Sequence, residues 1–153
     1  MSETDAMLDA TTALVPPLLT ALDALAYAGR HMHPPNIPAV VGAIESYQEP
    51  LEAGLDVFSA VAWPEDLQEF VEHARSSAMI ALKAYAGVNA AAEDPDPAML
   101  AYRAMGLATK AVEAAYPLTY MLPPVSRYFL EPSHRDDKTW LEALGNKSPM
   151  QPN

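Results

Sequence analysis

The chain has 153 residues, a length that suits a single domain. It has no cysteine and a formal net charge of −11. The absence of cysteine excludes a disulfide framework, a thiolate zinc site and a cysteine nucleophile, and the negative charge argues against binding to nucleic acids or to anionic membrane surfaces. Half of the residues are hydrophobic, so the chain can bury a core.

The N-terminus does not resemble a secretory signal, because residues 2–5 include two acids where a signal peptide would carry basic residues. No apolar run approaches the roughly 18 residues that a membrane-spanning helix requires. We therefore expect a cytoplasmic protein without a membrane span.

An apolar repeat at helical spacing predicts the first helical stretch, between residues 5 and 32. Pro16 and Pro17 lie in its middle, where each proline removes a backbone hydrogen bond and crowds the preceding turn. The prediction is therefore a short helix before the two prolines and a longer helix that starts at them.

A second helix is predicted from Asn36, a good N-cap residue, to about Phe58. Pro50 lies inside it and predicts a kink, because it removes the hydrogen bond to the carbonyl of Ser46. Residues 31–74 contain eight acids and no lysine or arginine, so this part of the molecule should be the more negative. Four of these acids form one solvent-facing stripe along the predicted helix: Glu45, Glu49, Glu52 and Asp56.

A third helix should begin after Trp63, with Pro64 in its first turn, and small residues on its inner face would let a neighbour approach closely. A fourth helix is capped by Asp96 and ends near Tyr116. Short connections favour antiparallel neighbours. These elements predict an all-α fold, an up-and-down bundle of about four main helices with a proline-rich apolar C-terminal segment and a short final helix.

The C-terminal part of the sequence differs in character from the predicted bundle. Residues 118–132 are apolar and aromatic, but their prolines forbid one continuous helix. A short helix is predicted at 136–144, before Gly145. We interpret residues 1–145 as the helical bundle domain and residues 146–153 as a loose tail or a truncated linker.

No catalytic motif is recognisable. The chain has no Gly-x-Ser-x-Gly and no glycine-rich phosphate loop, and we expect no catalytic residue, cofactor or metal. Glu69 and His73 are one helical turn apart, but a two-metal bundle needs matching pairs on two helices. We interpret this pair as a solvated ion pair.

Candidate ligand or interface residues fall into two groups. His31 and His33 could bind a metal or a carboxylate, although histidines also suit the negative end of a helix dipole. The second group lies within residues 116–130, which would mark an interface if exposed and would close the bundle if buried. Its members are Tyr116, Tyr120, Met121, Arg127, Tyr128 and Phe129. Arg127 could contact an anion or pair with a carboxylate of the chain.

Five segments resemble the N-terminal region of bacterial predicted esterases of the phospholipase/carboxylesterase-like group. They are Arg-His-Met-His-Pro-Pro at 30–35, Trp-Pro-Glu-Asp-Leu at 63–67, Ala-Tyr-Arg at 101–103, Tyr-Pro-Leu-Thr-Tyr-Met-Leu-Pro-Pro-Val-Ser-Arg-Tyr-Phe-Leu at 116–130 and Arg-Asp-Asp at 135–137. The resemblance implies that an α/β-hydrolase domain with a Ser-His-Asp triad would follow residue 153. None of the triad residues is carried over to this chain.

Three functions follow as expectations. The resemblance implies that this chain is a non-catalytic accessory domain of a carboxylic-ester hydrolase, acting as a lid or as a docking or dimerisation domain. In this role it would contact the α/β-hydrolase domain in cis through residues 116–130. The first alternative is a stand-alone interaction bundle that forms a homodimer through the same segment. The second is a binder of a small apolar ligand, because the chain's eight methionines and seven tyrosines could line a pocket.

Overall fold

The computed structural model describes residues 2–122, and it confirms the all-α prediction: these residues form helices, without strands, joined by short connections. The α-helices are α1 (Glu3–His31), α2 (Ile37–Ile44), α3 (Gln48–Ser59), α4 (Gln68–Glu93) and α5 (Ala98–Ala115). Short 3-10 turns occur at Pro34–Asn36, Glu45–Tyr47, Glu65–Leu67 and Tyr116–Tyr120. Because α2 and α3 together correspond to the predicted second helix, the bundle has the four main segments that were expected.

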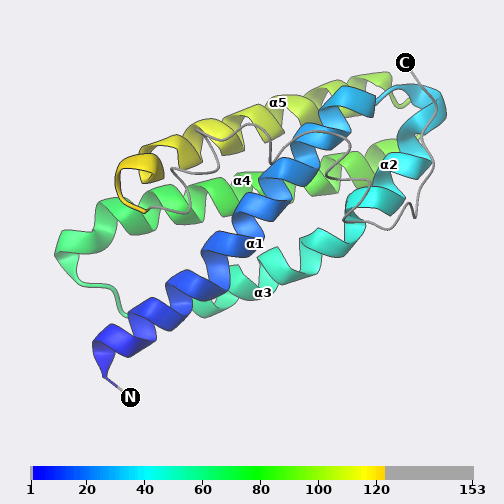
Figure 1. Ribbon diagram of the computed structural model, residues 1–153. Helices are drawn as coiled ribbons and strands as arrows, with labels where there is room; N and C mark the ends of the chain where they lie inside the picture. Colours follow the sequence, from blue (N-terminus) through cyan, green and yellow to red (C-terminus); the bar gives the residue numbers. More distant parts are fainter. Residues whose placement is uncertain (1, 123–153) are drawn as a thin grey trace.

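Two helix pairs build the core. The antiparallel pair of α4 and α5 makes the most extensive contact, and α1 packs against α3 and crosses between it and the first pair (Figure 1). The α4–α5 seam consists largely of alanine, with Ala78 and Ala111 fully buried. A Cβ atom at Gly87 would lie only 3.0 Å from the Cβ of Ala104, and the Ser77 hydroxyl donates to the carbonyl of Ala111 at 2.8 Å. Small side chains thus permit the close approach that the sequence predicted.

The predicted break at Pro16 and Pro17 is wrong, because α1 continues through both prolines. Neither proline has an N–H, so the carbonyls of Thr12 and Ala13 lose their helical donors. The Ala13 carbonyl instead lies directly against Gly54 of α3, whose lack of a side chain admits it. The buried side of α1, which includes Leu14, Val15 and Leu18, packs on the core on both sides of the prolines. Tertiary packing therefore offsets the local cost of the two prolines.

The second predicted helix does break, but one turn earlier than expected. The interruption is the 3-10 turn Glu45–Tyr47, whereas Pro50 is the third residue of α3, where a missing N–H costs little. The buried Tyr85 hydroxyl of α4 donates to the carbonyl of Ile44, at 3.1 Å, just where α2 ends. All four acids of the predicted stripe are exposed to solvent.

Two predicted caps differ in detail. Asn36 occupies the N-cap position of α2, but its side chain does not cap the helix and is buried. Asp96 is not the N-cap of α5, because Pro97 takes that position. The N–H of Asp96 instead donates to the Asp94 carboxylate at 2.8 Å, so the acids of this loop stabilise the turn before the helix.

One described helix, α1, is long and apolar enough to cross a bilayer by length and composition. This property was not expected from the sequence, because only uninterrupted apolar runs were considered. The core helix of a soluble protein and an N-terminal signal sequence pass the same test, and 56% of the relevant window is buried within the bundle. The predictions for the helix at 136–144 and the tail at 146–153 lie outside the described residues.

Candidate functional site: an apolar groove at one end of the bundle

A groove of about 490 Å³ lies where the first turns of α1 meet the start of α4 and the end of the described chain. We call it the apolar groove. Three segments supply its walls: Thr4, Met7, Leu8 and Thr11 of α1; Trp63, Asp66, Leu67, Glu69 and Phe70; and Met121 with Leu122. These segments are far apart in the sequence, so only the folded bundle brings them together.

An aromatic cluster holds the second wall in place. The Trp63 indole N–H donates to the carbonyl of Phe58 at 2.9 Å, and the two rings are tilted with centroids 4.6 Å apart. Phe70 meets both rings edge-on, at 5.8 Å from each. The Gln68 side-chain amide donates to the Trp63 carbonyl at 3.1 Å. These contacts fix the connection between α3 and α4, so the wall is preformed.

The apolar groove is open to solvent. Leu8 is 60% exposed and Met121 is 39% exposed, whereas Trp63, Leu67 and Phe70 are half-buried. Large aliphatic side chains that stay exposed beside a half-buried aromatic floor form the kind of surface that binds another molecule.

Acidic residues border the apolar groove on its α4 side. Asp66 and Glu69 line it directly, and Glu65 precedes them in the same wall. The first turns of α1 carry three more exposed acids, Glu3, Asp5 and Asp9, which do not line the groove. The Nε2 atom of His73 lies 4.0 Å from an oxygen of Glu69, in the exposed i,i+4 arrangement that the sequence predicted.

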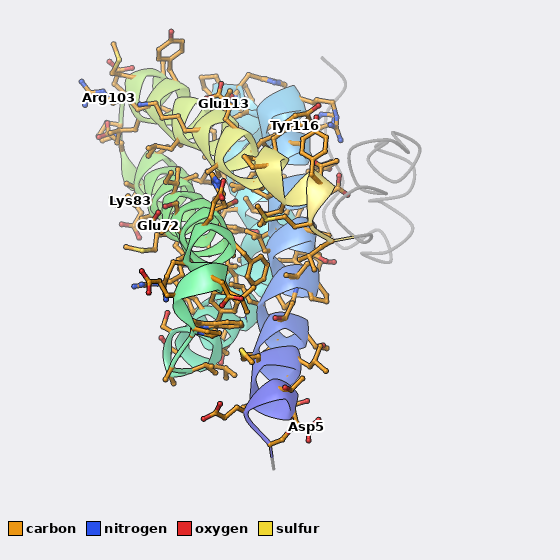
Figure 2. All side chains as sticks on the ribbon, turned by 90° about the vertical axis from the view of Figure 1, so that its left-hand side faces the viewer. Asp5, Glu72, Lys83, Arg103, Glu113 and Tyr116 are labelled. Carbon is orange, nitrogen blue, oxygen red and sulfur yellow. The ribbon has the colours of Figure 1, made fainter. Side chains whose placement is uncertain are left out.

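Three of the predicted interface residues, Tyr116, Tyr120 and Met121, lie within the described part of the chain. Tyr116 is 50% exposed and Tyr120 is 81% exposed, and their rings meet edge-on with centroids 6.3 Å apart. Tyr116 raises the pKa of Tyr120 above its ordinary value, mainly through a side-chain hydrogen bond. Figure 2 shows Tyr116 projecting at the end of α5. Met121 lines the groove itself, and Leu118 is buried. Of the seven described residues of the 116–130 segment, three are exposed, three are half-buried and one is buried, so the segment is partly surface and partly core.

The other predicted interface residues, Arg127, Tyr128 and Phe129, lie outside the described residues, so their placement stays a prediction.

The two histidines lie at the other end of α1. His31 is the last residue of that helix, and its ring centroid is 4.8 Å from that of Tyr27. His33 is extended, as expected before a proline, and lines a separate hollow of about 320 Å³. At 1.5 Å per residue, His31 lies about 30 Å along α1 from Thr11 of the apolar groove. The structure thus does not unite the histidines with the tyrosines.

Within residues 2–122, no group of three or more His, Cys, Asp or Glu residues could hold a metal ion. Ser77 is buried, and its hydroxyl donates to a backbone carbonyl of α5. The groove itself offers an apolar surface with an acidic border.

Sequence reasoning missed the α1 wall of the groove, Met7 and Leu8 in particular. Leu67 and Phe70 of the second wall are half-buried, whereas Val71 beside them is buried. A usable signal was present, because Met7 and Leu8 extend the apolar repeat of α1 one turn beyond its buried core.

Comparison with known proteins adds no relative. No protein-family model, no curated protein and no solved structure matches the chain. The resemblance to predicted esterases stays a prediction.

Proposed function

We propose that this chain is a non-catalytic helical docking domain that binds its partner through the apolar groove and the adjoining tyrosines Tyr116 and Tyr120. The observation that supports this proposal is a preformed apolar surface left open to solvent at one end of the bundle. Docking would bury the exposed parts of Leu8 and Met121, a gain of about 1 kcal/mol for each side chain. Central apolar anchors inside a polar rim are typical of interfaces.

The partner that the sequence resemblance implies is an α/β-hydrolase domain of a carboxylic-ester hydrolase, joined in cis. In this role the domain would act as an accessory lid or docking element that excludes water and shapes the acyl site. The groove supports docking in general, and the identity of the hydrolase rests on the resemblance alone.

Two measurements test the enzymatic part of the proposal. The purified chain should not hydrolyse p-nitrophenyl butyrate faster than a heat-denatured sample. Turnover that survives serine-directed inhibitors and further purification would contradict a non-catalytic role. The coding sequence beyond the codon for Asn153 tests the identity of the partner: an in-frame Gly-x-Ser-x-Gly supports a hydrolase, and a stop codon contradicts it.

A docking variant tests the surface. Leu8→Glu places a charge on an exposed side chain of the groove, so it should weaken partner binding without unfolding the bundle. Val57→Glu, on the exposed face of α3, is the matched control. Equal binding by the two variants, measured by titration with the recombinant hydrolase domain, would exclude the groove as the contact.

A small apolar ligand is the second candidate occupant, because the groove's volume lies in the range of ligand pockets and its lining is predominantly apolar. The neutral dye Nile red is a suitable probe, since its emission rises in apolar surroundings. Saturable binding that Leu8→Glu weakens would support this candidate, and unsaturable binding would remove it.

A homodimer through the same surface is disfavoured by the repulsion between two acidic borders. Light scattering at high protein concentration provides the test of this alternative.

A further inference from the structure

We infer that the partner of the apolar groove presents a basic amphipathic helix, with an apolar side that fills the groove and lysine or arginine side chains on its flanks. This inference rests on the proposed docking function and specifies the chemistry of the partner. It follows from the charge around the groove, from the distribution of basic residues and from the shape of the surrounding elements.

The charge around the groove has one sign. Asp66 and Glu69 line one wall. The opposite wall, from α1, has no lysine or arginine in its first turns, which carry three exposed acids, Glu3, Asp5 and Asp9. The rest of the lining is predominantly apolar, with Leu8, Leu67 and Met121 among the exposed or half-buried side chains. An apolar strip with an acidic border is complementary to an apolar strip with a basic border.

Lysine and arginine are absent from the residues that line the α1 and α4 walls. Residues 2–29 and 31–74 contain no lysine or arginine. Residues 2–122 hold 16 of the 20 acids but 5 of the 9 bases of the chain. Figure 2 shows Asp5 at the free end of α1, far from Lys83 and Arg103 on the other helices. The negative potential at the groove is therefore not offset by a neighbouring lysine or arginine of these walls.

The surrounding elements favour a helix as the occupant. The groove lies between helices, and the described residues offer no strand edge on which a partner strand could add. A helix that docks in such a groove contacts it with residues one turn apart, which leaves its flanks at the two borders. Lysine or arginine on the flank beside the α4 wall would meet Asp66 and Glu69.

The test uses the full chain with Trp140→Phe, which leaves Trp63 in the groove as the only tryptophan. Three synthetic peptides of about 18 residues serve as probes. The first has leucines at helical spacing and lysine elsewhere, the second has glutamate in place of lysine, and the third has the composition of the first in an order without an apolar face. Trp63 fluorescence reports binding.

The inference predicts that the leucine–lysine helix binds at least tenfold more tightly than both other peptides at low salt, and that this advantage over the glutamate peptide shrinks at about 0.5 M salt. The double variant Asp66→Asn/Glu69→Gln should weaken binding of the lysine peptide about tenfold. The matched control, Glu49→Gln/Asp56→Asn, removes the same charge from the exposed stripe of α3 and should leave binding unchanged.

The outcomes separate the inference from the proposed function. Equal binding of the lysine and glutamate helices would overturn the basic partner and leave apolar docking supported. Equal losses of binding in the two double variants would show general attraction to an acidic protein and overturn the inference. Binding of the third peptide, which has no apolar face, as tightly as the first would do the same. Failure of every peptide to change Trp63 fluorescence would overturn the groove as a docking site and the inference with it.

Discussion

Gly54 is the residue at which a single methyl group would disturb the packing of two helices. Its Cα faces the Ala13 carbonyl, which Pro17 leaves without a helical donor, and an added Cβ would overlap that carbonyl. A close Cα–H···O contact of this kind compensates in part for the missing hydrogen bond. Pro17 in α1 and Gly54 in α3 therefore depend on each other, because the glycine makes room for the carbonyl that the proline leaves without a donor.

Gly54→Ala should destabilise the protein by about 1–3 kcal/mol, because the clash is with backbone atoms that cannot rotate away. Gly106→Ala is the matched control, since a Cβ there has no neighbour within 4 Å. The control should stabilise by about 0.5–1 kcal/mol through helix propensity. Urea unfolding measures both values, and a gain in stability for Gly54→Ala would contradict the packing described.

Tyr85 links α4 to the end of α2 through its buried hydroxyl. Tyr85→Phe removes the donor and leaves the Ile44 carbonyl unpaired, so we expect a loss of about 1–2 kcal/mol at pH 7. Tyr102→Phe, on the exposed surface of α5, should not change the free energy of unfolding at that pH.

Tyr85 also predicts a pH dependence. Burial, with a smaller contribution from Tyr47, raises the pKa of Tyr85 well above its ordinary value of 10.0. Above pH 10 the unfolded chain loses this proton while the folded chain keeps it, so this contribution to stability is complete below pH 10 and falls as the pH rises further. Unfolding measured from pH 9 to 11 should show a smaller decrease for Tyr85→Phe, and an identical decrease would contradict this assignment.

At the scale of the element, α1 shows where local rules and tertiary packing disagree. Pro16 is exposed and lies on the solvent side of a continuous helix. Pro16→Ala restores an N–H that can donate to the Thr12 carbonyl, so we expect a gain of about 2 kcal/mol in the free energy of unfolding. Thermal unfolding checks the sign, and a lower melting temperature would show that proline stabilises α1 by another route.

The helices themselves were predictable from apolar spacing and proline position. The starts of α4 and α5 follow Pro64 and Pro97, and the alanines of α4 face α5 as their spacing indicated. The path through Pro16 and Pro17 was not predictable, because the compensating Gly54 lies 37 residues further on. The groove was unpredictable for the same reason: its walls meet only after α1, α4 and the end of α5 have packed.

At the scale of the whole molecule, the net charge of −11 acts against the compact state, because like charges repel one another across the surface. Added sodium chloride screens this repulsion, so about 0.5 M salt should raise the melting temperature by about 2–4 °C. The same salt should weaken the binding of a basic peptide. A melting temperature that falls with salt would mean that attractive ion pairs outweigh the repulsion.

The alanine seam between α4 and α5 also governs the shape of the binding end. Met121 and Leu122 follow directly from α5 through the turn Tyr116–Tyr120, so the position of α5 decides how wide the groove opens. The hydrogen bond from Ser77 to Ala111 and the close approach of Gly87 to Ala104 both depend on how α4 and α5 are aligned. A change at mid-bundle that shifts this alignment would therefore widen or narrow the mouth of the groove without touching any residue that lines it.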